Sequence, residues 1–218
     1  ITGTNDAPVA TFDTAQAATE GGAAVSVTLT STDADTGDTA TYSIDNPVDG
    51  VSRAADVITF DPAHPAYEEL DEGDTLDVTV SYTVADTLGA TGSNSFVITV
   101  TGTNDAPVAT FTTQQDVTEG DPVVDGSVTS TDVDADDTAT YAHDNDPIAG
   151  FTFNSDGTWS FDPSDAAYQS LEDGAPQTVT VNYTVTDSQG ASASESFDIV
   201  ITGANDAPVA TFDTAQAA

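Results

Sequence analysis

The sequence predicts an all-β protein made of tandem antiparallel β-sandwiches. Short stretches alternate apolar residues with hydroxyl-bearing ones, as in Val25, Val27 and Leu29, and a period of two is typical of strands with one buried face. Turn residues separate these stretches about every dozen residues, and no stretch has the period of an amphipathic helix. Disorder is the alternative for so acidic a chain, but the regular alternation and the recurring aromatic residues argue against it.

One phrase recurs along the chain and sets its organisation. It reads ITGTNDAPVATFDTAQAA at residues 1–18, VTGTNDAPVATF at 100–111 and ITGANDAPVATFDTAQAA at 201–218. Its asparagine recurs after 99 and then 101 residues, and a unit of that length can bury a core of its own. We therefore expect a window from a longer array, divided into 1–4 (end of a preceding repeat or linker), 5–103 (sandwich repeat A), 104–204 (sandwich repeat B) and 205–218 (truncated start of a third repeat).

The strands of repeat A follow from this alternation and from the turn residues between them. They are expected at residues 24–33, 39–44, 57–60, 76–86 and 93–102.

Repeat B keeps the same plan, with strands expected at 125–132, 138–144, 151–161, 178–187 and 194–203. The stretch 151–161 is expected to be a hairpin that turns at Asp156 and Gly157 and presents four aromatic residues to the core: Phe151, Phe153, Trp159 and Phe161. Only the segments 62–70 and 163–171 suggest a helical turn.

Composition limits the partners of this chain. Lys and Arg total 1 against 38 Asp and Glu, giving a formal net charge of −37, so nucleic acids and anionic membranes are poor partners. No apolar run reaches the roughly 20 residues of a membrane-spanning helix, which argues against direct membrane insertion. Cysteine is absent, so no disulfide stabilises the repeats and another form of cross-link is expected.

The acidic residues keep their place from repeat to repeat. One glutamate follows the first strand of each repeat, aspartates cluster in the loop after the second strand, and one aspartate ends the penultimate strand. Calcium takes 6 to 8 oxygen ligands, and carboxylates, amides and backbone carbonyls supply them. Duplication alone also copies bystanders, so the spacing shows common architecture first and a calcium site second.

Other metal sites and catalytic motifs fit poorly. An EF-hand starting at Asp33 or Asp132 would place Ile44 or His143 where a glutamate is required. His64 and His143 occupy different places in their repeats, which disfavours zinc. No nucleophile elbow, phosphate loop or H-E-x-x-H motif is present, so we expect no enzymatic activity, although paired carboxylates for glycoside hydrolysis remain an open alternative.

The stretch GTWSFDPSDAAYQSLEDGAPQTVTVNYTVTDSQGASASESFDIVITGANDAP, residues 157–208, resembles the VCBS repeat of giant bacterial adhesins. The junction phrase and the FDP, AYxxL and YTVTD segments carry this resemblance across both repeats. It implies an exported protein, often type I secreted (RTX), that lies on the extracellular cell surface. Its repeats would extend a distal binding region for adhesion to surfaces or cells and for biofilm formation.

The chain also resembles cadherin repeats, which implies an Ig-like sandwich in each repeat. The D-x-D loop, the YTVAD strand end and the TNDAP linker carry this resemblance, which implies Ca²⁺ bound between successive repeats. Residue by residue, the junction of A and B would use Glu20, Asp71, Glu72, Asn104, Asp105, Asp132, Asp134 and Asp187. The equivalent half-sites would be Asn5, Asp6, Asp33, Asp35 and Asp86 at the start, and Glu119, Glu172, Asn205 and Asp206 at the end. Asp38 and Asp137 could instead close a site local to each D-x-D loop.

Two functional hypotheses follow. The first is a structural extender whose linkers are stiffened by calcium, monomeric in this fragment and in contact with neighbouring repeats of its own chain. The second is a carbohydrate- or protein-binding module that acts through its sandwich surface. The segment 205–218 has a strand sequence without a domain to complete, so we expect it to be disordered or to pair with a sheet edge of another molecule.

Overall fold

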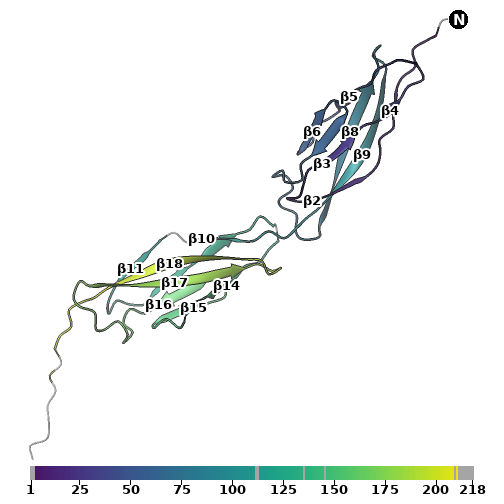
Figure 1. Cartoon of the computed structure of the whole chain (residues 1–218). Helices are drawn as coiled ribbons and strands as arrows, with labels where there is room; N and C mark the ends of the chain where they lie inside the picture. The colour runs from purple at the N-terminus through teal and green to yellow at the C-terminus, as the bar shows by residue number, and fades with distance from the viewer. Residues whose placement is uncertain (1–2, 111–112, 135, 145, 209, 211–218) are drawn as a thin grey trace, which may run out of the picture. The chain divides into compact units, whose positions relative to one another are not determined.

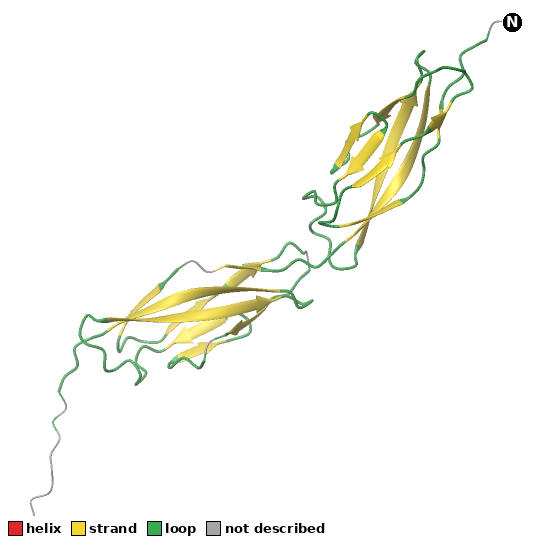
Figure 2. Cartoon of the chain, viewed as in Figure 1, coloured by secondary structure: helices red, strands yellow, loops and turns green. Residues whose placement is uncertain are grey.

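The computed structural model describes residues 3–110, 113–134, 136–144, 146–208 and 210. The regular elements of this part of the chain are all β-strands (Figures 1 and 2). Within it, no helix is long and apolar enough to cross a membrane. The chain divides into two compact units, residues 1–105 with 132–137, and residues 106–131 with 138–218.

Repeat A is a sandwich of two main sheets. The four-stranded sheet has the order β2-β9-β8-β5, formed by β2 (Gln16–Thr19), β9 (Thr91–Thr101), β8 (Thr75–Ala85) and β5 (Thr41–Ile44). The three-stranded sheet has the order β3-β7-β6, formed by β3 (Val25–Thr28), β7 (Val57–Phe60) and β6 (Val51–Ala54). A short pair, β1 (Val9–Ala10) and β4 (Ser31–Thr32), completes the repeat.

Repeat B has the same topology. Its four-stranded sheet has the order β11-β18-β17-β14, formed by β11 (Gln115–Thr118), β18 (Ser192–Thr202), β17 (Pro176–Thr186) and β14 (Thr140–His143). Its three-stranded sheet has the order β12-β16-β15, formed by β12 (Val124–Ser127), β16 (Thr158–Phe161) and β15 (Phe151–Phe153). The short pair is β10 (Val108–Thr110) and β13 (Thr129–Thr131).

The core of each repeat lies between its two main sheets, as the alternation predicts. In β8, Val80, Tyr82 and Val84 are fully buried, and they face Ile58 and Phe60 of β7 in one apolar cluster. Burying each such side chain stabilises the fold by roughly 1.5–3 kcal/mol. The all-β sandwich class is therefore confirmed.

The predicted hairpin of repeat B is also confirmed. Phe151 pairs with Phe161 and Phe153 with Trp159 in register, and all four side chains join the core cluster of the repeat. Gly157 takes a left-handed φ of 82° at the turn. Trp159 is only 3% exposed, so the single tryptophan is a core residue.

The start of each repeat differs from the prediction in two ways. The stretch 24–33 is not one strand, because β3 ends at Thr28 and β4 joins β1 in a separate pair. The pairing of β2 with β9 is parallel, with Thr19 opposite Thr101, whereas β8 and β9 are antiparallel. The parallel register brings the residue after β2 beside the residues that follow β9.

The segments 62–70 and 163–171 form turns rather than helices. In repeat A, the backbone N–H of His64 donates to the Asp61 carbonyl, and that of Tyr67 donates to the His64 carbonyl. These are i→i+3 bonds that do not continue into a helix. Tyr67, only 4% exposed, anchors the segment in the core, and its hydroxyl donates to the Asp49 carbonyl.

Gly102 allows a close approach at the end of repeat A. A Cβ at this position would lie 2.3 Å from the Asp71 carbonyl oxygen and 2.4 Å from that of Leu70. Gly203 has the same role in repeat B, where a Cβ would lie 2.3 Å from the Glu172 carbonyl oxygen. The glycine of the junction phrase therefore holds the chain leaving the sandwich against the loop that follows the turn segment.

Candidate metal sites

Glu20 is a buried carboxylate at the end of β2. Its side chain is 4% exposed, and its Oε2 accepts a hydrogen bond from the Thr103 backbone N–H at 3.4 Å. The parallel register of β2 and β9 sets this contact, because the backbone N–H of Glu20 donates to the Thr101 carbonyl. Among the described residues, no hydrogen-bond donor reaches its buried Oε1.

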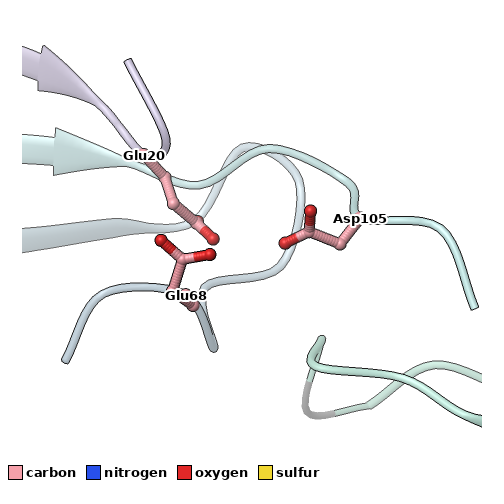
Figure 3. Close-up of side chains that lie close together, drawn as sticks. All are labelled: Glu20, Glu68 and Asp105. Atoms are coloured by element: carbon pink, nitrogen blue, oxygen red, sulfur yellow. The ribbon is translucent and has the colours of Figure 1, made fainter. Parts of the chain in front are cut away.

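Two further carboxylates gather around Glu20. One oxygen each from Glu20, Glu68 and Asp105 lies within 4.8 Å of the others. Figure 3 shows the Glu20 and Glu68 carboxylates pointing toward one another, with Asp105 turned toward the same space from the segment that follows β9. Three acids without a cation among them repel one another, so this group favours a bound positive charge.

The surroundings of Glu20 raise its pKa from an ordinary value of 4.5 to about 7. Burial is the largest cause, because it penalises the charged carboxylate. The Thr103 N–H lowers the pKa, while the negative charges of Asp105, Asp134 and Glu68 raise it. A cation would reverse this balance and keep Glu20 ionised.

Asp134 is a second buried carboxylate, in the loop after β13. It is 4% exposed, and its Oδ2 accepts a hydrogen bond from the Asp105 backbone N–H at 2.7 Å. No donor in the described chain reaches its Oδ1. Burial raises the pKa of Asp134, the Asp105 N–H lowers it, and nearby carboxylates, with Asp105 first among them, raise it.

The rest of this loop forms a group of its own within repeat B. Oxygens of Asp132, Asp137 and Asp187 lie within 4.8 Å of one another. The Asp134 backbone N–H donates to Asp132 Oδ1 at 3.2 Å, while no donor in the described chain reaches the buried Asp132 Oδ2. Asp137, the alternative local ligand of the sequence analysis, thus lies beside two residues that were assigned to the junction.

The start of repeat A repeats this arrangement. The Asp6 backbone N–H donates to Asp35 Oδ2 at 2.7 Å, as Asp105 does to Asp134. Oxygens of Asp33, Asp35 and Asp38 lie within 4.8 Å of one another, and the buried Asp33 Oδ2 has no donor among the described residues.

Asp86 and Asn5 lie beside this group. The Asn5 amide donates to Asp86 Oδ2 at 2.8 Å, and this bond is the largest cause of the lowered pKa of Asp86. Asp33, Asp38 and Asp86 line one open cavity of about 140 Å³.

Glu119, which follows β11, has the same position in repeat B as Glu20, which follows β2, has in repeat A. Glu119 is 6% exposed, its Oε2 accepts a hydrogen bond from the Ala204 backbone N–H at 3.1 Å, and no described donor reaches its Oε1. Glu172, Asn205 and Asp206 are exposed, and no group of three carboxylates in the described chain includes Glu119.

The two predicted ligands of the LDEG segment, Asp71 and Glu72, differ in burial. Asp71 is half-buried, and its buried Oδ1 has no donor among the described residues. Glu72 is exposed and belongs to none of the carboxylate groups, because the chain turns at Gly73, whose φ is 86°.

Glu68 is the residue that sequence reasoning missed. It follows Tyr67, whose ring packs on Phe60 with centroids 5.2 Å apart, so the core anchor directs the next residue toward Glu20. The recurring AYxxL segment was a signal that this position is fixed, but it does not tell which of Glu68 and Glu69 turns inward.

These groups fit a calcium ion. Their members are carboxylates alone, which are the oxygen ligands calcium takes. Each group contains or adjoins a buried carboxylate oxygen that no donor in the described chain satisfies, at Glu20, Asp33, Asp132 and Asp134. A buried polar atom is normally hydrogen-bonded, and a cation at these positions would supply the partner that these oxygens lack.

The comparisons with known proteins agree with the tandem β-sandwich fold. Residues 104–200 match the family model described as a bacterial Ig domain. A search of curated proteins finds no match.

Three solved structures illustrate the likeness of fold. Mouse cadherin-23 EC22-24 has a TM-score of 0.53 at 17% identity, covering 92% of this chain and 67% of that one. Human protocadherin-24 EC1-2 has a TM-score of 0.52 at 18% identity, covering 94% of this chain and 100% of that one. PcdhgB3 EC1-4 has a TM-score of 0.55 at 14% identity, covering 91% of this chain and 50% of that one. The chain is therefore a tandem of Ig-like, cadherin-like β-sandwiches, and its second repeat matches the bacterial Ig domain.

Proposed function

We propose that the chain is a pair of structural extender repeats from a bacterial surface adhesin, with linkers stiffened by calcium. In this proposal the repeats resemble the VCBS repeats of RTX adhesins and carry a distal binding region away from the cell for adhesion and biofilm formation. The protein acts outside the cell, where extracellular modules bind calcium with dissociation constants of roughly 10⁻⁴–10⁻³ M. Its partners are the neighbouring repeats of its own chain, and the 218-residue chain is monomeric.

The buried Glu20 carboxylate carries the proposal. Its Oε1 lacks a donor among the described residues and lies beside two further acids, an arrangement that is costly for the ionised carboxylate unless a cation is bound. Calcium would accept oxygens from Glu20, Glu68 and Asp105 together and remove the repulsion between them.

The position of Asp105 in the sequence connects the ion to the linker. Asp105 lies between Gly102, which packs against repeat A, and Pro107, which has no N–H to donate to a sheet. An ion that fixes Asp105 would restrict the φ and ψ angles of the residues that join the repeats. Without it, the net charge of −37 favours separation of the acids and a flexible linker.

Calcium would also replace the disulfides that the chain lacks. Small extracellular domains commonly gain stability from cross-links, and a ligand that binds only the folded state stabilises it by about 2.7 kcal/mol at one hundred times its dissociation constant. The chain has no cysteine, so bound ions are the cross-links its composition offers.

The alternative of a sugar- or protein-binding surface gains no support from the aromatic residues. Trp159, the residue best suited to stack on a sugar, is 3% exposed and packs on Phe197 with ring centroids 5.2 Å apart. The large apolar residues that are exposed include Val9, Leu88 and Val123, which lie in separate segments.

Isothermal titration calorimetry of the whole chain tests the calcium proposal. We expect saturable calcium binding in the range of roughly 10⁻⁴ to 10⁻³ M at physiological ionic strength, and much weaker binding of magnesium, whose octahedral shell is smaller and more rigid. Heat that does not saturate, or equal heats for both ions, would contradict a built calcium site.

A further inference from the structure

Repeats A and B end in similar loops that differ at several positions, among them Glu68 in repeat A and Gln169 in repeat B. Tyr67 and Tyr168 precede them, both buried, with rings 5.2 Å from Phe60 and 5.3 Å from Phe161. The Tyr67 hydroxyl donates to the Asp49 carbonyl, and that of Tyr168 donates to the Ala149 carbonyl. The same anchor therefore holds a carboxylate in one repeat and an amide in the other.

The residue that Glu68 faces is equivalent in the two repeats. Glu20 and Glu119 are both buried, both accept one backbone N–H at Oε2, and both have a buried Oε1 that no described donor reaches. The following glycine also has the same contact, because Gly21 N–H donates to the Pro62 carbonyl and Gly120 N–H to that of Pro163, each at 3.2 Å. The backbone contacts of the two glutamates are thus the same, while Asp105 lies in the Glu20 group and its counterpart Asp206 is exposed.

Gln169 lies at these backbone contacts through its amide. Its Nε2 donates to the Pro163 carbonyl at 3.3 Å, the same carbonyl that Gly120 binds next to Glu119. An amide oxygen can still bind calcium, but it brings no negative charge, and the charge of the ligand set tunes calcium affinity.

We propose that Glu20 of repeat A and Glu119 of repeat B each bind calcium, that the Glu20 site binds it more tightly, and that the exchange of Glu68 for Gln169 contributes to the difference. This inference rests on the proposed calcium function. It implies that, as calcium rises, the end of repeat A fills first and the end of repeat B fills later. An array of alternating repeats would then stiffen in two stages.

Two backbone amides allow each site to be followed separately in the whole chain. The Thr103 N–H donates to Glu20 and the Ala204 N–H donates to Glu119, so their NMR chemical shifts report calcium at each glutamate. We would titrate calcium into the wild-type chain and into Glu68→Gln and Gln169→Glu variants. Each substitution converts one repeat to the residue of the other with little change in shape.

We expect Glu68→Gln to raise the calcium midpoint of the Thr103 shift by roughly tenfold and to leave that of Ala204 in place. Gln169→Glu should lower the Ala204 midpoint by a similar factor and leave Thr103 in place. The controls Glu69→Gln and Ser170→Glu change the same net charge at the adjacent exposed positions and should move either midpoint by less than about twofold.

The outcomes separate this inference from the function on which it rests. Calcium-dependent shifts that Glu68→Gln and Gln169→Glu leave unchanged, or change no more than the controls do, would overturn the inference and leave calcium binding intact. A Thr103 amide that does not respond to calcium in the wild-type chain would overturn both.

Discussion

Glu20 is buried where the fold supplies one weak donor and two facing acids. Its pKa is raised to about 7, chiefly by burial, so the folded chain without calcium holds a proton there more tightly than the unfolded chain does. Protonation therefore favours the folded state, and the contribution of Glu20 to stability is full below pH 4.5 and lost as the pH rises through about 7.

The Glu20→Gln variant should separate the destabilising effect of the Glu20 charge without calcium from its contribution to calcium binding. In chelator at pH 8, we expect the variant to be more stable than the wild type by roughly 2 kcal/mol, because one pKa unit corresponds to about 1.4 kcal/mol and solvent at the loop reduces the full effect. At pH 4, where Glu20 is protonated, the difference should vanish. With calcium at pH 8 the order should reverse, because the wild type gains the binding energy. Urea denaturation under the three conditions measures this, and an unchanged order with calcium would contradict a role for Glu20 as a ligand.

The sequence predicted most of the acids that gather, because repeats place them at constant spacing. Asp33 and Asp132 lie in such groups, and each carries a buried oxygen that no described donor satisfies. Glu68 could not be predicted, since only the packing of Tyr67 decides which of two adjacent glutamates faces Glu20. Glu72 was predicted as a ligand and is exposed. The sequence does not show that the turn at Gly73 leaves Asp71 as the half-buried acid.

The junction glycine connects the loop of Asp71 to the chain that leaves β9. Gly102 has no room for a Cβ beside the Leu70 and Asp71 carbonyls, whereas Gly3, its counterpart in the same phrase, has no described atom within 4 Å of that position. The pair provides a matched comparison within one chain.

Gly102→Ala should force the loop at 70–71 away from the chain after β9 and displace Asp71 and Asp105. We expect a loss of about 1–3 kcal/mol in the free energy of unfolding, as overpacking typically costs, together with weaker calcium binding. Gly3→Ala should change neither by a measurable amount. Thermal unfolding and calorimetry of both variants measure this, and equal behaviour of the two would contradict the close packing at Gly102.

The D-x-D loop of repeat B provides a second test. Asp132→Ala combined with Asp134→Ala removes two buried oxygens that no described donor satisfies, and we expect calcium affinity to fall by roughly a hundredfold or more. Asp136→Ala removes one charge from an exposed position in the same loop and should reduce affinity by less than about threefold. Competition with a chromophoric chelator measures both, and an equal loss of binding free energy per charge removed would mean that the loop acts through net charge alone.

Long strands were predicted well and short ones poorly. The stretches 76–86 and 93–102 became β8 and β9, because eleven residues of alternation identify a half-buried strand. The strands β1 and β2 have two and four residues and join different sheets, so no alternation is long enough to show them. β2 pairs with β9 in parallel because the chain passes from the sheet of β1 to the sheet of β9 between β1 and β2. The local sequence pattern gives no sign of this crossing.

The net charge of −37 makes the whole chain sensitive to the ionic strength of the solution. Salt weakens repulsion between all exposed acids, whereas a built calcium site neutralises a few buried ones at much lower concentration. A comparison at fixed ionic strength therefore separates specific calcium binding from general screening.

Small-angle X-ray scattering of the 218-residue chain at fixed ionic strength, once with millimolar calcium and once with a chelator, tests the extender proposal most directly. We expect a longer particle with a narrower distribution of interatomic distances only when calcium is present, because bound ions would restrict the linker. Magnesium at the same concentration should leave the chelator profile unchanged. Identical profiles with calcium and with chelator would contradict a calcium-stiffened linker, and would assign the acids to solubility or to isolated loop sites.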